Sequence, residues 1–202
     1  DLLVKILFEL GKGTRRLKFD KNGLPIGFTD GVYKTVVKDL YGTAISNVTR
    51  DFVKEHYGID CEVIHNGIDT DQFTPKGFLI EEWEEQKRNG KKILYSSGRI
   101  EGRKGHPFLV EASEILKHRG WNFVLYLGGD GVNKKHVQNM VMRKGLQEDV
   151  IFVGNFPFEK YSRAQRTADV CAVPATGNEG FGRAPVEAAA SGSIPVVSEI
   201  DG

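Results

Sequence analysis

The residues best suited to bind a ligand or take part in a reaction lie near the C-terminal end, in the stretch NEGFGRAPVE at residues 178–187. An apolar run directly before this stretch predicts a buried parallel strand. Pro185 is typical of the first turn of a helix, and Gly192 is typical of the left-handed position that follows a helix. The stretch therefore predicts a strand, a glycine-rich loop and a helix N-terminus, with Glu179 on the loop and Glu187 in the first helical turn.

A helix N-terminus preceded by glycines is a favourable place for a phosphate group. Its unpaired N–H groups carry a partial charge of about +0.5, and glycines let a ligand approach the backbone closely. Carboxylates would repel a phosphate unless they meet another part of the same ligand, such as sugar hydroxyls. A nucleotide sugar has both parts. The alternative is an ordinary helix start with acids favoured by the helix dipole, and this stretch alone does not decide between the two.

A second group of candidate residues lies on a glycine-rich basic loop, residues 98–105. Arg99 directly follows a strand-like run and Lys104 opens the next predicted helix, so both can turn toward one edge of a sheet. Two cations beside a helix N-terminus form a good diphosphate clamp, with each charge-assisted hydrogen bond worth about 1.5–3 kcal/mol. The alternative is a solvated basic loop. Residues 128–131 form a further glycine turn, which does not complete a dinucleotide-binding motif.

The elements that position these loops alternate regularly along the chain. Strand-like runs cover residues 93–96, 123–127, 150–153, 169–174 and 194–197, with helical patterns between them. This alternation predicts an α/β fold with a doubly wound parallel sheet. Because the crossovers of such a sheet are right-handed, the loops that follow its strands share one edge, where these sheets bind ligands.

Part of a second α/β unit is expected before this sheet. Its expected elements are helices over residues 30–40 and from an Asn47 N-cap, with strands at residues 43–46 and 61–65. A charged helix over residues 78–92, around Trp83, is expected after this unit. Residues 66–75 are rich in turn signals and connect the two parts. The basic residues between Gly11 and Gly27 are interpreted as a solvated loop in preference to a binding patch.

Composition argues against several other classes of protein. The 202 residues are 40% hydrophobic and 27% charged, and the formal net charge of +1 argues against nucleic-acid binding. Cys61 and Cys171 are expected to be small buried hydrophobes, which fits a reducing, cytoplasmic location. No histidine cluster occurs, no metal or other cofactor is expected, and the five histidines are interpreted as surface or packing residues. No apolar run reaches the ~18 residues that span a membrane, and there is no signal-peptide pattern.

Five motifs come in the order and spacing of one known family. They are Gly98-Arg99 with Lys104-Gly105, then Gly129-Asp130-Gly131, Phe152-Val153-Gly154, Glu179-Gly180-Phe181-Gly182 with Glu187-Ala188, and Ser191-Gly192. The chain resembles the donor half of a retaining glycosyltransferase of family four, with the GT-B fold. The resemblance covers residues 93–202 well, and residues 66–75 resemble the family's segment between its two domains.

This resemblance implies a role for each motif. Arg99 and Lys104 would hold the donor diphosphate, Glu179 would contact the transferred sugar, and these three are the expected catalytic residues. Glu187 would accept hydrogen bonds from the ribose hydroxyls. The expected donor-binding residues are Gly98, Arg99, Lys104, Gly154, Asn155 and Phe156 near the base, and Glu179, Gly180, Phe181, Gly182, Arg183, Ala184 and Glu187. In this family cations and dipoles stabilise the leaving diphosphate, usually without a bound metal.

The resemblance also implies a domain organisation and a function. Residues 1–75 would be part of the acceptor-side domain with the interdomain segment, and residues 76–202 a nucleotide-sugar-binding domain cut at its C-terminus. The expected activity is a hexosyltransferase type, moving a sugar from a nucleotide sugar to a sugar, lipid-linked sugar or protein acceptor with retention of configuration. Whether so short a chain is active alone is left open. The alternatives are a non-catalytic nucleotide-sugar-binding module, or a related phosphorylase or epimerase.

Two departures from the family pattern limit these expectations. Pro185 removes one N–H donor from the start of the helix, where Arg183 could supply a cation instead. The catalytic histidine of the family belongs to its N-terminal half and has no matching position here, so no general base is assigned. A peripheral membrane contact through that missing half is a further expectation.

Overall fold

The computed structural model describes residues 42–177 and 179–200. The helix expected over residues 30–40 and the basic segment before it lie outside the described residues. The chain divides into two compact units. The first includes residues 42–43 and 50–62, and the second includes residues 44–49 and 63–200.

The first described elements are a short strand, a helix and a second short strand. They are β1 (Gly42–Ala44), α3 (Asn47–Tyr57) and β2 (Cys61–Val63), and the two strands pair in a small sheet. The order matches the expectation, but the N-cap does not. Ser46 caps the helix, because its Oγ accepts the N–H of Thr49 at 3.2 Å, and Asn47 is already the first helical residue.

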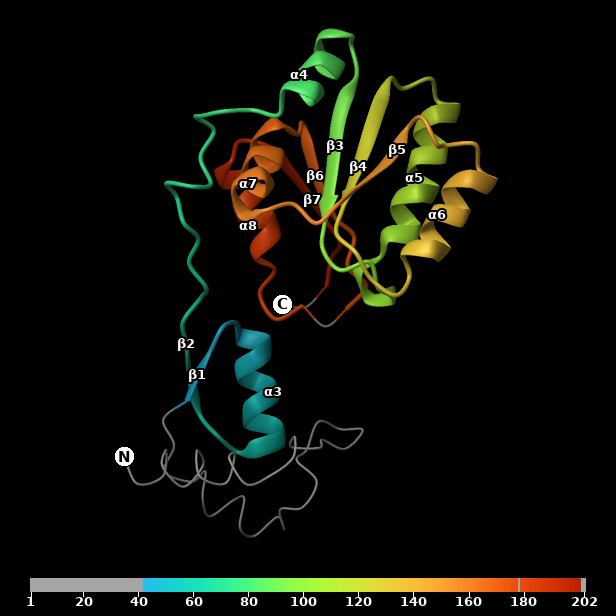
Figure 1. Cartoon of the computed structure of the whole chain (residues 1–202). Coiled ribbons are helices and arrows are strands. Elements are labelled where there is room, and N and C mark those ends of the chain that lie inside the picture. The colour runs from blue at the N-terminus through green and yellow to red at the C-terminus, as the bar shows by residue number, and fades with distance from the viewer. Residues whose placement is uncertain (1–41, 178, 201–202) are drawn as a thin grey trace, which may run out of the picture. The chain divides into compact units, whose positions relative to one another are not determined.

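The larger unit contains the doubly wound parallel sheet that the sequence predicts. Its strands are β3 (Lys92–Ser97), β4 (Phe123–Gly128), β5 (Val150–Gly154), β6 (Val170–Val173) and β7 (Ile194–Val197). Within residues 42–177 and 179–200, these form a five-stranded sheet in the order β5-β4-β3-β6-β7, with every neighbouring pair parallel (Figure 1). The expected fold class is therefore confirmed.

Helices cover both faces of this sheet. They are α4 (Glu81–Arg88), α5 (His106–His118), α6 (Lys134–Arg143), α7 (Phe158–Thr167) and α8 (Arg183–Ala190), with a 3-10 turn η1 (Gly102–Lys104) before α5. In Figure 1, α5 and α6 lie on one side of the strands and α7 and α8 on the other. This arrangement follows from right-handed crossovers between parallel strands.

Two expected helix positions differ from the structure by one or two residues. Gly182 adopts a left-handed φ of 69° and caps α8, so the helix begins at Arg183 and Glu187 lies in its second turn. Gly105, also at φ 69°, separates η1 from α5. Lys104 therefore ends the 3-10 turn, and α5 begins at His106.

The central strand β4 shows why the sheet is buried on both faces. Alternate residues of a strand point to opposite faces. Phe123, Leu125 and Leu127 pack in one cluster with residues of α5 and α6. Val124 and Tyr126 pack in a second cluster on the opposite face. A continuous apolar run is therefore needed here, as in other buried parallel strands.

The second cluster includes the charged helix α4, for which the sequence indicates no site. Its Trp83 is buried and stacks on Tyr126, with ring centroids 4.2 Å apart and planes 9° apart. Trp83 is the buried residue of this short amphipathic helix, and its stacking contact anchors α4 to the sheet.

The order of the strands creates a crevice at one edge of the sheet. β3 lies between β4 and β6, and the chain continues from β3 to one face and from β6 to the other. The loops that follow these two strands therefore diverge, and ligands of doubly wound sheets bind at such a point.

Two glycines allow the loops at this edge to touch. A Cβ on Gly105 would lie 1.8 Å from the carbonyl oxygen of Pro174, and a Cβ on Gly129 would lie 2.0 Å from the carbonyl oxygen of Gly98. Both distances are far inside van der Waals contact, and the opposing atoms are backbone. These loops can close on one another only because the side chains are absent.

We expect Gly105→Ala to destabilise the chain much more than Gly120→Ala. Both residues have a left-handed φ, 69° and 75°, but a Cβ on Gly120 meets nothing within 4 Å. Gly120→Ala, the control, should lower the free energy of unfolding by about 1–2 kcal/mol because of the backbone conformation. Gly105→Ala should lower it by a further ~1–3 kcal/mol because of the clash. Urea unfolding measures both values. Equal losses would show that the contact with Pro174 relaxes freely.

Candidate functional site

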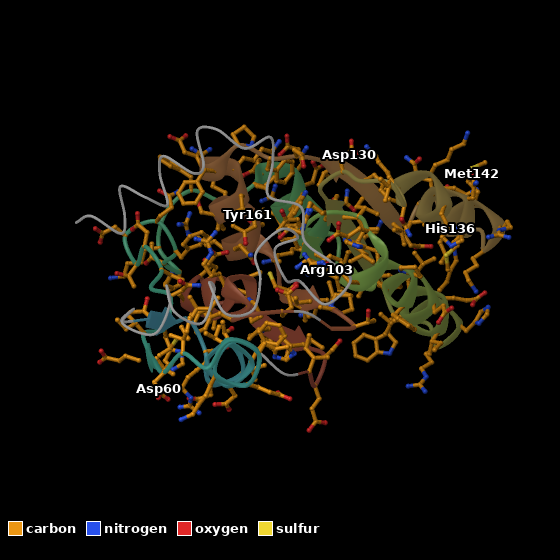
Figure 2. The ribbon with its side chains drawn as sticks, turned by 90° about the horizontal axis from the view of Figure 1, so that it is seen from below. Asp60, Arg103, Asp130, His136, Met142 and Tyr161 are labelled. Atoms are coloured by element: carbon orange, nitrogen blue, oxygen red, sulfur yellow. The ribbon has the colours of Figure 1, made fainter. Side chains whose placement is uncertain are left out.

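A cavity of about 480 Å³ opens at the carboxyl edge of the sheet, between the loops that follow β3 and β6. Figure 2 looks onto this edge from below, with Arg103, Asp130 and Tyr161 labelled on three different segments. Most of the residues expected from the sequence line the cavity. They are Gly98, Arg99, Lys104, Gly154, Asn155, Phe156, Glu179, Gly182, Arg183, Ala184 and Glu187.

Gly180 and Phe181, which the sequence also indicates, do not line this cavity. Phe181 lines a separate hollow together with Val186 and Val197. The loop turns sharply at Gly182, with φ 69°. Glu179 and the start of α8 lie on the cavity wall, whereas Phe181 between them does not.

Glu179 is held by two cations from the loop that follows β3. Its Oε1 contacts the Nζ of Lys104 and lies 3.2 Å from Nη1 of Arg103. Arg103 also pairs with Glu101, at 2.8 Å. These contacts neutralise a carboxylate that would otherwise repel a phosphate beside it. Sequence reasoning included Arg103 only as one basic residue of its loop, because nothing local indicates its contact with a loop about 75 residues away.

Arg99 extends into the open part of the cavity. Its side chain is 71% exposed, and its Nη2 lies 3.3 Å from a carboxylate oxygen of Glu101. An exposed ion pair of this kind contributes about 0–1 kcal/mol, so an anionic ligand can replace it at little cost. Arg99 is therefore the more available of the two predicted cations, whereas Lys104 already has a partner.

Glu187 is a buried carboxylate on the opposite wall. It is 6% exposed, and its Oε2 accepts a hydrogen bond of 2.5 Å from the hydroxyl of Tyr161 on α7. Its other oxygen lies 3.9 Å from Nε of Arg183. Tyr161 also lines the cavity, although the sequence analysis does not single it out. The signal that was available is the spacing of Tyr161 and Gln165, which places two polar side chains on one face of that helix.

His106 is a second lining residue that sequence reasoning did not single out. It is 2% exposed, and neither ring nitrogen has a hydrogen-bond partner in the described part of the chain. Burial, and then the neighbouring charge of Lys104, hold the pKa of His106 below its usual value. The imidazole is therefore neutral near pH 7, and it adds no positive charge to the cavity floor.

The two cysteines differ in how deeply they are buried. Cys171 is buried, as expected, whereas Cys61 is only partly buried. Among residues 42–177 and 179–200, no group of three or more His, Cys, Asp or Glu side chains is arranged to hold a metal ion. In the same residues, no helix has both the length and the apolar character needed to cross a bilayer.

We expect the buried His106 to make stability fall at acid pH. Because its pKa is lower in the folded chain, the unfolded chain binds the proton first, and the folded state loses this contribution as the pH falls below about 6.5. His106→Leu should therefore reduce the loss of unfolding free energy between about pH 7 and about pH 5, measured by urea denaturation. The exposed His118 provides the control His118→Leu. An identical pH dependence in wild type and His106→Leu would contradict the assignment.

Comparison with known proteins identifies the family of the chain. Residues 79–202 match the family described as glycosyl transferases group 1. The chain is 30% identical over 172 residues to a phosphatidyl-myo-inositol mannosyltransferase of Mycobacterium tuberculosis, covering 85% of this chain and 44% of that protein. It is 33% identical over 141 residues to the putative glycosyltransferase EpsF of Bacillus subtilis, covering 68% and 35%. The chain thus spans less than half the length of these relatives.

Solved structures agree with this assignment. A glycosyltransferase from Rickettsia africae is 25% identical, with a TM-score of 0.73 over 89% of this chain and 49% of that one. HepE from Anabaena, solved with UDP and glucose, is 20% identical, with a TM-score of 0.70 over 87% of this chain and 50% of that one. At 20% identity, the match to HepE shows that the two proteins share a fold. The chain therefore belongs to the group 1 glycosyl transferases, the retaining family-four enzymes with the GT-B fold.

Proposed function

We propose that this chain forms the donor site of a retaining glycosyltransferase, and that the donor is a nucleoside-diphosphate sugar. The observation that carries this proposal is the cavity at the carboxyl edge. There, two cations, a helix N-terminus and two carboxylates on opposite sides line one space. Each group suits a different part of a nucleotide sugar.

The diphosphate would lie between the loop that follows β3 and the start of α8. Gly182, Arg183 and Ala184 line the cavity, so the unpaired N–H groups of this helix end and its partial positive charge lie at the wall. Arg99 and Lys104 supply charge from the opposite side. Pro185 contributes no N–H, and the exposed side chain of Arg183 offers a cation near the same place.

The two carboxylates would bind the hydroxyl-rich ends of the donor. Glu187 is the proposed acceptor for the ribose hydroxyls, with the base near Asn155 and Phe156. Glu179 is the proposed contact to the transferred sugar. Because Lys104 pairs with Glu179, binding would exchange part of this ion pair for a contact between Lys104 and the donor phosphate.

This arrangement assists the chemistry by stabilising the leaving group. When the bond between the sugar and the diphosphate breaks, negative charge develops on the diphosphate. Arg99, Lys104 and the dipole of α8 would meet that charge, which is the main way in which oriented dipoles and cations lower a barrier. We propose that these groups suffice without a metal ion.

The names of related proteins support the same donor class. One relative is a mannosyltransferase, and a structural neighbour was solved with UDP-glucose. Because this chain spans less than half the length of the relatives named above, the proposal assigns donor binding to it. Transfer and the acceptor belong to the whole protein.

We expect Arg99→Ala and Lys104→Met to weaken binding of nucleoside diphosphates by about 1.5–3 kcal/mol each, since each removes one charge-assisted contact. Isothermal titration calorimetry with UDP, GDP and ADP, and with their common sugar conjugates, measures this effect. The bare nucleosides should bind weakly and equally to all variants. Lys135→Met removes an exposed lysine of α6 outside the cavity and serves as the matched control.

The proposal fails if wild type binds none of these nucleotides at millimolar concentration. It also fails if both cavity variants behave like Lys135→Met, because the bound nucleotide would then lie elsewhere.

A further inference from the structure

Glu187 lies at the end of a series of side-chain hydrogen bonds that leads from the cavity to strand β6. The hydroxyl of Tyr161 donates to Oε2 of Glu187 at 2.5 Å, and Nε2 of Gln165 donates to the Tyr161 hydroxyl at 2.7 Å. The thiol of Cys171 donates to Oε1 of Gln165 at 2.7 Å. These hydrogen bonds therefore connect β6, through α7, to the carboxylate on α8.

Every hydrogen bond in this series is donated toward Glu187. Burial raises the pKa of the Cys171 thiol to about 12, so the thiol keeps its proton and remains a donor. It contacts the oxygen of the Gln165 amide, which leaves the NH₂ group for Tyr161. Burial, and then the hydrogen bond to Glu187, raise the pKa of the Tyr161 hydroxyl, so it also stays protonated. Tyr161 accepts from Gln165 and must then donate to Glu187.

Glu187 depends on this donor because its other stabilising contact is weak. The nearby cation is Arg183, whose side chain is 65% exposed and whose Nε is 3.9 Å away. A pair at that distance and exposure is screened by water. A side-chain carboxyl that is only 6% exposed needs a hydrogen-bond partner to offset its loss of contact with water. The Tyr161 hydroxyl is thus the contact that fixes the position of Glu187.

We propose that Tyr161, oriented by Gln165, is a positioning residue that fixes Glu187 with its second oxygen presented to the ribose of the donor. The inference rests on the proposed function of the cavity. It explains how the cavity would prefer ligands that carry ribose hydroxyls. With Oε2 occupied, Oε1 is the oxygen available to ligand hydroxyls. An ordinary packing role for Tyr161 would affect folding, but it would not distinguish ligands by their ribose hydroxyls.

The test combines protein variants with a ligand that lacks the hydroxyls. Calorimetry compares whichever of UDP, GDP and ADP binds wild type most tightly with its 2′,3′-dideoxy counterpart. Wild type should prefer the ribonucleotide. Tyr161→Phe should weaken the ribonucleotide about tenfold and leave the dideoxynucleotide unchanged, which corresponds to one lost hydrogen bond to a charged group. Gln165→Met should change the preference in the same direction, by about threefold, because it leaves Tyr161 free to turn.

Tyr126→Phe is the matched control, because it removes a buried tyrosine hydroxyl of the same core outside the cavity. Its ribose preference should equal that of wild type. Thermal melting without nucleotide reports whether each variant is folded, and if Tyr161→Phe does not fold, Gln165→Met decides the question.

Two outcomes overturn the inference in different ways. If a folded Tyr161→Phe, or Gln165→Met in its place, keeps the wild-type preference or loses affinity equally for both ligands, Tyr161 does not position Glu187, and the proposed donor site still stands. If wild type binds neither nucleotide, the proposed function fails and the inference fails with it.

Discussion

The parallel pairing of β3 with β6 is the constraint on which the candidate site depends. Leu94 pairs with Val170 and Tyr95 with Cys171, although two further strands come between β3 and β6 in the sequence. The pairing places their carboxyl ends side by side while the following segments leave toward opposite faces of the sheet. A crevice is unavoidable at that point. The close approach of Gly105 to Pro174 then fixes the distance between the two loops.

The site holds its two carboxylates in different ways, and the difference matters for a ligand that contains both phosphate and hydroxyls. Glu179 is neutralised by Lys104 and Arg103, so its charge is available only after an exchange of partners. Glu187 is held by the neutral hydroxyl of Tyr161, so its charge remains on the wall. One wall therefore combines cations with a paired acid, and the other combines a helix N-terminus with a single fixed acid.

Sequence patterns predict the sheet and much of the cavity wall, because both depend on local signals. Alternation of strands and helices predicts the fold class, and Arg99, Lys104 and Glu179, each beside a glycine, lie on loops that follow strands and so share one edge. Tyr161 and His106 could not be selected in this way. Each lies on an ordinary amphipathic helix, and only the packing of α7 against α8 and of α5 against the sheet brings them to the cavity. The helix boundaries at Gly105 and Gly182 were missed for a similar reason, since a left-handed φ is set by the contacts of the loop.

A crystal structure of this chain with the nucleoside-diphosphate sugar that it binds most tightly would test the central claim most directly. The account predicts the diphosphate within hydrogen-bond distance of Arg99, Lys104 and the first N–H groups of α8. It also predicts the ribose hydroxyls on Glu187, with the Tyr161 hydroxyl still on the other carboxylate oxygen. A nucleotide bound away from the cavity between β3 and β6, or one in the cavity with its ribose turned away from Glu187, would contradict it.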